Sequence, residues 1–199
     1  MATAGNVPVG YRLRVATLDD ETCLRHLIAR SIRGLGSEDY TPAQIDAALR
    51  GAFGVDTAII RDQTYFVAVT DASTIAACGG WSKRRTLFGS DERAERDESL
   101  LDPRCEPAKI RAFFVDPAHA RRGLGRAILA RSELQAIQAG FSAFELMATL
   151  PGARLYEACG YRRGNPLEHP LPGGHSIRFV PMVKRGPQPA RLRRKRSPC

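Results

Sequence analysis

The chain has 199 residues, of which 43% are hydrophobic and 26% are charged, and its formal net charge is +9. This length suits one well-cored domain, since domains commonly run to roughly 100–200 residues, and the composition excludes an intrinsically disordered chain. No segment approaches the roughly 20 consecutive apolar residues that a membrane-spanning helix requires, and the first residues lack a secretory leader, so we expect a cytoplasmic protein that does not contact a membrane.

The positive charge is concentrated at the end of the chain. From Lys184 onward there are seven basic residues and no acidic residue, so the rest of the chain is close to neutral. We expect a flexible N-terminus over residues 1–10, one domain over residues 11–185 and a basic, disordered tail over residues 186–199. The tail could hold nucleic acid non-specifically, and a solvated tail is the simpler alternative.

Five cysteines are scattered along the chain, without a C-x-x-C pair or a histidine at zinc-finger spacing. This arrangement disfavours a zinc site and a disulfide framework. Free thiols in a reducing compartment are the simpler interpretation, and we expect no metal.

Hydrophobic periodicity and turn residues predict alternating strands and helices. Asp19 or Asp20 is the expected N-cap of the first helix, and Thr41 followed by Pro42 begins the second. A long charged segment in the middle of the chain predicts a loop or lid. In chain order we expect strand 11–17, helix 21–36, helix 42–51, a hairpin of strands 64–70 and 74–82, the charged loop, strand 108–115, helix 124–140, strand 141–148, helix 151–160, and two final strands, 161–165 and 176–183.

The fold class follows from the β-α-β unit in the second half. Strand 108–115, the helix after it and strand 141–148 should form a parallel pair joined by a right-handed crossover. The hairpin and the final strands predict antiparallel neighbours. We therefore expect a mixed α/β fold with one central parallel pair in a mostly antiparallel sheet.

The stretch "ARRGLGR", residues 120–126, lies between that strand and that helix. The first N–H groups of a helix have no carbonyl partner, so phosphate oxygens satisfy them and the helix dipole adds attraction. Gly123 and Gly125 let the backbone approach a ligand without a Cβ atom, and three arginines add charge-assisted contacts. The turn therefore predicts a diphosphate site.

Two common nucleotide motifs do not match this turn. A Walker loop requires a lysine directly after its last glycine, and no lysine follows here. A Rossmann fingerprint requires a third glycine where this chain has Ile128, and it should open the domain. The diphosphate is therefore expected to belong to another ligand.

The order of strand, "RRGLG", helix, strand and "LYEACGY" resembles the GNAT superfamily of acyl-CoA-dependent N-acetyltransferases over about residues 11–184. The family's pyrophosphate motif, [QR]-x-x-G-x-[GA], is similar to "ARRGLG", with Ala120 at the usual Gln or Arg place. Thr149 stands where an Asn is often found, so a pantetheine contact should differ. The family's late motif is similar to Leu155, Tyr156, Gly160 and Tyr161.

The resemblance implies an N-acetyltransferase in which a primary amine attacks the thioester of acetyl-CoA directly. It implies pantetheine between the two parallel strands, a backbone N–H near Phe113 that polarises the thioester carbonyl, and protonation of the leaving thiolate by Tyr156. Tyr156 and Phe113 are thus the implied catalytic residues. The implied contacts to acetyl-CoA come from Phe113, Phe114, Val115, Ala120, Arg121, Arg122, Gly123, Leu124, Gly125 and Arg126.

The general base is left open by the sequence. Several family members carry a Glu where this chain has Lys109, and an amine acts as a base near neutrality only if its pKa is strongly depressed. A water chain to solvent is one alternative. The side-chain candidates are Glu106, Glu145, Glu168, His169 and His175.

The resemblance assigns acceptor selection to residues 34–41, 91–98 and 165–175, for an acceptor that is a small-molecule or peptide amine. Residues 91–98, "DERAERDE", contain five acids and two arginines. An acidic lip that attracts a cationic amine is one hypothesis for them, and a solvated loop is the alternative.

Two other functions stay open at this stage. A non-catalytic acyl-CoA-binding sensor or interaction protein fits the Lys109 substitution, and a nucleic-acid-associated protein fits the basic tail. A homodimer is a further expectation, because dimers are frequent among similar proteins.

Overall fold

The computed structural model describes residues 6–92 and 96–186, so the expected basic tail lies outside the described residues apart from Gly186. The elements within them follow in this order: β1 (Tyr11–Val15), η1 (Leu18–Asp20), α1 (Glu21–Leu35), α2 (Pro42–Ala48), α3 (Thr57–Arg61), β2 (Tyr65–Thr70), β3 (Ile75–Ser82), β4 (Ala108–Val115), η2 (Pro117–His119), α4 (Leu124–Gln138), β5 (Ala143–Thr149), α5 (Leu150–Ala158), β6 (Arg162–Arg163), β7 (Leu167–Leu171), η3 (Pro172–Gly174) and β8 (His175–Arg185).

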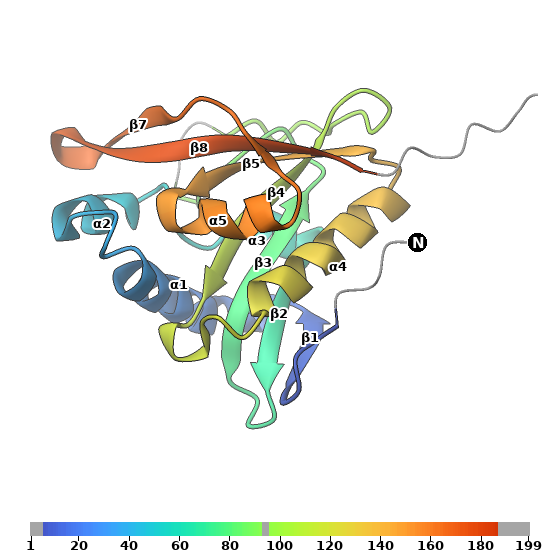
Figure 1. Cartoon of the computed structure of the whole chain (residues 1–199), viewed down its shortest axis with the longest axis horizontal. Helices are drawn as coiled ribbons and strands as arrows, with labels where there is room; N and C mark the ends of the chain where they lie inside the picture. Colours follow the sequence, from blue (N-terminus) through green and yellow to red (C-terminus); the bar gives the residue numbers. More distant parts are fainter. Residues whose placement is uncertain (1–5, 93–95, 187–199) are drawn as a thin grey trace, which may run out of the picture.

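One sheet organises the described chain, in the strand order β1-β2-β3-β4-β5-β8-β6, with β7 paired to β8. The β4–β5 pair is parallel, and the other pairs in this sheet are antiparallel. In Figure 1, β5 and β8 lie across the top of the view, whereas β2 and β3 lie steeply below them, joined by a hairpin at the bottom. The predicted mixed α/β class with one central parallel pair is confirmed.

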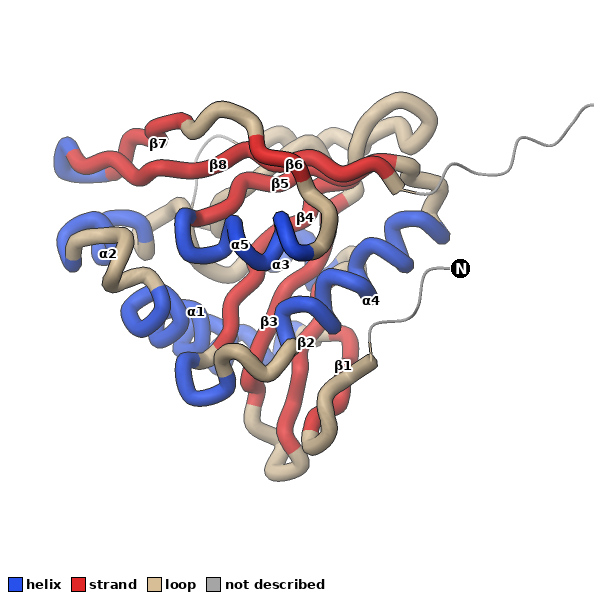
Figure 2. The backbone as a smooth tube through the Cα atoms, in the orientation of Figure 1, coloured by secondary structure: helices blue, strands red, loops and turns tan. Residues whose placement is uncertain are grey.

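Helices cover both faces of the sheet (Figure 2). Helices α1, α2 and α3 bury apolar side chains on one side, which we call the α1 face, and α4 and α5 do so on the other, the α4 face. Because successive strand residues point to opposite faces, Phe113 of β4 packs on the α4 face and Phe114 packs on the α1 face. The last residues of β4 therefore contact the helices on both faces of the sheet.

Two of the predicted helix starts differ in how they are capped. At α2, Thr41 Oγ1 accepts from Gln44 N at 3.3 Å and the Gln44 side chain accepts from Thr41 N at 2.9 Å, which completes a capping box before Pro42. At α1, Asp20 occupies the N-cap position without bonding the helix. Its carboxylate instead accepts from Arg14 at 2.6 and 2.7 Å, and this pairing lowers the pKa of Asp20.

The sequence prediction was wrong about the end of the chain and missed one helix. The last region holds three strands, because residues 167–171 form β7 against β8 although Pro170 interrupts the run. Proline is tolerated there since β7 lies at a sheet edge. Helix α3 was not predicted. It is only five residues long, and the Asp56 carboxylate caps it by accepting from Ala58 N at 3.0 Å.

The segment predicted as a loop or lid is an ordered extension over its described residues. We call residues 83–101 the arm. Its two sides are joined by backbone hydrogen bonds from Leu101 N to Lys83 O (2.8 Å) and from Arg85 N to Ser99 O (3.0 Å). The arm thus continues β3 as an irregular antiparallel ladder before the chain enters β4.

Candidate active site

The turn between β4 and α4 has a backbone suited to an anion. Arg121 and Gly123 adopt left-handed conformations, with φ of 62° and 85°, and Gly123 is the N-cap of α4. Left-handed residues set before a helix start can turn successive N–H groups toward one side, as in the nests that bind phosphate. Strain at a non-glycine residue such as Arg121 is typical of functional sites.

The two glycines of the turn serve different purposes. A Cβ atom at Gly123 would meet only Pro8 Cγ at 3.7 Å, so this glycine is required by its φ angle. A Cβ atom at Gly125 would lie 2.9 Å from Leu155 Cδ2 and 3.9 Å from Val115 Cγ2. Gly125 therefore permits the close packing of α4 on α5 and β4.

The arginines of the turn are not equivalent. Arg122 donates to Tyr11 Oη at 3.3 Å, and that oxygen lies 2.7 Å from His119 Nδ1. Arg121 and Arg126 are exposed and form no ion pair with described residues. Tyr11 of strand β1 thus contacts the turn through Arg122, while Arg121 and Arg126 stay available for a ligand.

Strands β4 and β5 separate beside this turn. They pair only at Ala108↔Phe144 and Lys109↔Glu145, and beyond these positions the edge of β4 that faces β5 has no strand partner. Such an edge leaves backbone N–H and C=O groups for another extended chain to bond. This separation is the geometry that the resemblance predicts for bound pantetheine.

A bulge distorts β4 at the same level. Ala112 has φ of 56°, and Ala112 and Phe113 together face the single residue Gly79 of β3. Tyr65 Oη donates to Ala112 O at 2.8 Å, and a Cβ atom at Gly79 would lie 2.8 Å from the Phe113 ring. The bulge is therefore held by a hydroxyl on one face and by a missing Cβ on the other.

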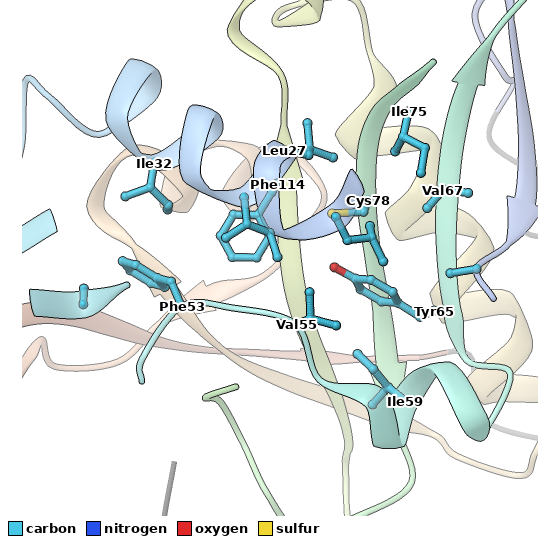
Figure 3. Close-up of a cluster of buried hydrophobic side chains, with 14 of the residues drawn as sticks. Leu27, Ile32, Phe53, Val55, Ile59, Tyr65, Val67, Ile75, Cys78 and Phe114 are labelled. Carbon is cyan, nitrogen blue, oxygen red and sulfur yellow. The ribbon is translucent and has the colours of Figure 1, made fainter. Parts of the chain in front are cut away.

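The residues after the bulge are fixed from the α1 face. The Phe114 ring contacts the Phe53 ring, with centroids 6.2 Å apart, and both lie in the buried cluster of Figure 3. Val115 N donates to Ser31 Oγ of α1 at 3.1 Å. The Val115 amide is thus occupied, which leaves its carbonyl as the group available to a ligand.

Tyr156 of α5 lies against the bulge on the α4 face. Its ring centroid is 6.0 Å from that of Phe113 and 5.7 Å from that of Tyr161. The side chain is 7% exposed, its Oη makes no hydrogen bond to any described residue, and burial raises its pKa. The same effect raises the pKa of the buried Cys78 thiol to about 12. Burial in this interior therefore raises the pKa of a thiol and of a phenol alike.

The candidate general bases fall into two groups. Glu106 and Glu168 are ion-paired near the surface, to Arg85 and Arg178, each at 2.8 Å, and His175 is exposed. Glu145 and His169 are half-buried. Glu145 forms an ion pair with Lys109 where the strands part, so the lysine that replaces the expected Glu is itself bound to a carboxylate.

The hollows of the described surface include one of about 630 Å³ and one of about 170 Å³. Both lie along α1, and neither is lined by Gly123, Phe113 or Tyr156. Across residues 6–92 and 96–186, no three His, Cys, Asp or Glu side chains gather as metal ligands, and no helix has the length and apolarity to cross a bilayer.

A model of the acetyltransferase (GNAT) domain matches residues 61–163, just over half of the chain. The chain belongs to the GNAT acetyltransferases. It is therefore an acyl-CoA-dependent N-acetyltransferase, as the two sequence motifs predict. Comparison with curated protein sequences finds no match.

Solved structures of GNAT proteins are similar in fold. A GCN5-related N-acetyltransferase from Rhodopseudomonas palustris is 17% identical with a TM-score of 0.65, covering 90% of this chain and 98% of that one. PaiA N-acetyltransferase from Thermoplasma acidophilum, in complex with coenzyme A, is 12% identical with a TM-score of 0.61, covering 88% and 98%. The ribosomal-protein-S18-alanine N-acetyltransferase from Escherichia coli is 16% identical with a TM-score of 0.55, covering 92% and 98%.

Within this GNAT fold, the residues that the sequence singles out occupy three places. Residues 120–126 form the turn, Phe113, Phe114 and Val115 end β4, and Tyr156 contacts Phe113 from α5. The residues that hold β4 in shape, Tyr65 and Ser31, were not found from sequence. One available signal was the Gly79–Gly80 pair, since glycine inside a strand often marks a bulge or a close approach.

The acidic-lip hypothesis for this GNAT chain lacks support in the described residues. Each described acid among residues 91–98 already has a partner: Asp91 with Arg96 (2.8 Å), Glu92 with Arg25 (3.6 Å), Asp97 with Ser99, and Glu98 with Arg96 (2.9 Å). The solvated-loop alternative also fails for Arg96, whose side chain is 10% exposed. The arm is joined to the rest of the chain by the pairs from Arg96 to Asp56 (2.7 Å) and from Glu92 to Arg25.

Proposed function

We propose that this GNAT acetyltransferase transfers an acetyl group from acetyl-CoA to a primary amine by direct attack, without an acyl-enzyme. The observation that carries the proposal is the separation of β4 from β5 directly beside the left-handed turn of Arg121 and Gly123. One extended ligand with a diphosphate can bond both features: its chain along the free edge of β4, and its phosphates at the start of α4.

The turn residues fit the diphosphate by charge as well as by backbone. The free N–H groups at the start of α4 face the anion, and Arg121 and Arg126 add positive charge without giving up an existing ion pair. Ala120 offers no side-chain contact at the place where relatives carry Gln or Arg. We propose that the backbone from Arg122 to Arg126 does most of the binding.

Phe113 supports catalysis through its backbone. The bulge at Ala112 and Phe113 takes the strand out of regular register, so the Phe113 N–H is the proposed donor to the thioester oxygen as negative charge develops on it. One such donor elsewhere contributes about 2.7–4 kcal/mol to transition-state stability. No particular side chain is needed for this role, although the Phe113 ring sets the position of the strand.

Tyr156 is the proposed acid. As the amine nitrogen bonds to the carbonyl carbon, the C–S bond breaks and Tyr156 Oη gives its proton to the departing thiolate. Burial raises the pKa of Tyr156, which weakens it as an acid. A thiolate in the same apolar surroundings becomes more basic for the same reason, so the pKa values of the phenol and of the leaving thiol stay close to each other.

The proton of the amine leaves on the α1 face in this proposal. Glu145 lies on that face but three positions before the level of Phe113, roughly 10 Å along the strand, which is too far for direct transfer. We therefore propose that water carries the proton away from the amine. His169 and Glu145 are the candidate groups on this face to receive it.

The decisive experiment measures thiol release from acetyl-CoA with a panel of primary amines, together with the mass of the acetylated product. A transferase releases thiol only when an accepted amine is present. A sensor would bind coenzyme A, measured by calorimetry, and release none with any amine. Binding without turnover across the whole panel would contradict the proposal.

A further inference from the structure

Two of the segments that the family resemblance assigns to acceptor selection, residues 34–41 and 165–175, and the arm that carries the third meet around Phe179 of β8. The arm supplies Phe88, whose ring centroid is 5.1 Å from that of Phe179. β7 supplies His169, 4.9 Å from Phe88 and 6.0 Å from Phe179. The α1–α2 connection supplies Tyr40, whose Oη donates to Arg178 O at 3.0 Å. Phe179 itself is buried, whereas Phe88 and His169 are half-buried and reach the surface.

This aromatic group, Phe88, His169 and Phe179, lies about level with the proposed oxyanion donor. Because Ala112 and Phe113 share one position opposite Gly79, Phe113 stands three positions beyond the Lys109↔Glu145 pair, level with Ala148, whose neighbour Thr149 pairs with Phe179. Phe179 also belongs to the α1 face, as does Phe114. The aromatic group therefore stands on the face opposite Tyr156, from which an amine could attack while Tyr156 protonates the thiolate.

The position of Phe88 is fixed by buried charges. Arg111 of β4 donates to Gly89 O at 2.8 Å and pairs with Asp56 at 2.7 Å. Asp56 also accepts from Arg96 of the arm at 2.7 Å. Asp56 and Arg111 are 1% and 4% exposed, so the backbone beside Phe88 is tied to the strand that carries the bulge.

The charges near this aromatic group do not favour a second cation on the acceptor. The described acids of the arm are all paired, and Glu168 of β7 is bound to Arg178 at 2.8 Å and to Ser176 Oγ at 3.0 Å. A polyamine would need to break such pairs or rely on exposed acids such as Glu38 and Asp39 of the α1–α2 connection, which contribute little. An apolar ring instead gains from burial against Phe88 and from edge-to-face contacts.

We propose that the acceptor is a primary amine that carries an aromatic ring and no second positive charge, with the ring bound against Phe88 and His169. This substrate class rests on the proposed function, because it concerns the same reaction. Phe88 and His169 are then specificity-determining residues, and Asp56, Arg96 and Arg111 position Phe88.

The test compares three amines with acetyl-CoA at saturation: 2-phenylethylamine, n-butylamine and spermidine. For the unaltered protein, kcat/KM for 2-phenylethylamine should exceed that for n-butylamine about tenfold or more, as expected for burial of one ring. Spermidine should be the poorest of the three. Equal values for the first two amines, or a preference for spermidine, would overturn the substrate class while leaving the transferase function standing.

Two variants separate recognition of the ring from general packing. Phe88→Leu keeps an apolar side chain and removes the ring, so the preference for 2-phenylethylamine should fall about tenfold with KM for acetyl-CoA unchanged. Leu100→Ala is the matched control, because Leu100 is 59% exposed on the same arm, and it should keep the preference. A Phe88→Leu variant with undiminished preference overturns the proposal. Absence of thiol release with every amine, despite bound coenzyme A, overturns the proposed function and this inference together.

Discussion

The proposed donor side and the proposed acceptor side of this site are built in different ways. On the α4 face, the proposed coenzyme A contacts come mainly from one short run, residues 120–126, and from the adjoining end of β4. On the α1 face, the aromatic group joins Phe88, His169 and Phe179, which come from the arm, β7 and β8. Local backbone shape forms the first, and pairing of distant side chains forms the second.

This difference predicts unequal tolerance of substitution on the two proposed sides. A turn that binds through backbone N–H groups tolerates many side chains, as Ala120 illustrates. An aromatic group held by Asp56, Arg96 and Arg111 depends on each side chain. The donor side should therefore be robust to most substitutions outside its glycines, whereas the acceptor side should be sensitive to a few buried charges.

The largest expected effect is on the acceptor side, from Asp56→Ala. The change leaves the Arg111 guanidinium buried without its counter-charge and removes the cap of α3, so the free energy of unfolding should fall by about 3–5 kcal/mol. Urea denaturation measures it. Asp46→Ala is the control, since Asp46 pairs with Arg33 at 3.1 Å with both side chains more than half exposed, and should change stability by less than about 0.5 kcal/mol. If both variants lose a similarly small amount of unfolding free energy, Asp56 does not hold the arm in place.

The next effect concerns chemistry at the boundary of the two sides. Tyr156→Phe should lower kcat about 100-fold and leave the dissociation constant of coenzyme A unchanged.

Because burial raises the pKa of Tyr156 above its usual value near 10, the protonated acid persists to higher pH, and kcat should show no loss from this group below about pH 10. A pH profile of kcat checks whether the pKa of Tyr156 is raised.

Tyr161→Phe serves as the matched control for that experiment. Tyr161 contacts Tyr156, is 3% exposed, and its buried Oη has no hydrogen-bond partner among the described residues. Its removal should leave kcat within about threefold and stability unchanged or higher. If both variants lose the same activity, Tyr156 has no special role as an acid.

A smaller effect distinguishes the two glycines of the turn. Gly123→Val forces a side chain into a left-handed conformation, so the dissociation constant of coenzyme A should rise about tenfold, with a stability loss of about 1–2 kcal/mol. Gly125→Val instead overlaps Leu155 and should act mainly on stability, by about 1–3 kcal/mol. Calorimetry and urea denaturation separate these outcomes. Normal affinity in the Gly123 variant would argue against a diphosphate at this turn.

The same division separates what the sequence could predict from what it could not. The strand, turn and helix at residues 108–140 follow from local periodicity and from the glycine pair, so both the β-α-β unit and the turn were predicted. The bulge was not, because "AFFV" reads as regular strand and Ala112 is held by Tyr65, 47 residues away. The arm's role was misjudged since Arg96 finds Asp56 only in the folded chain.

The smallest effect tests whether the two sides are independent. Tyr11→Phe keeps the ring beside His119 and removes the hydroxyl that Arg122 donates to, so KM for acetyl-CoA should rise about threefold with KM for the amine unchanged. Tyr40→Phe is its counterpart, removing the bond to Arg178 O and the acceptor of Leu150 N, and it should raise KM for the amine instead. Steady-state kinetics with each substrate varied in turn gives both constants. If either hydroxyl shifts the KM of the other substrate as strongly as its own, the donor and acceptor sides are coupled through α5, and the division between them fails.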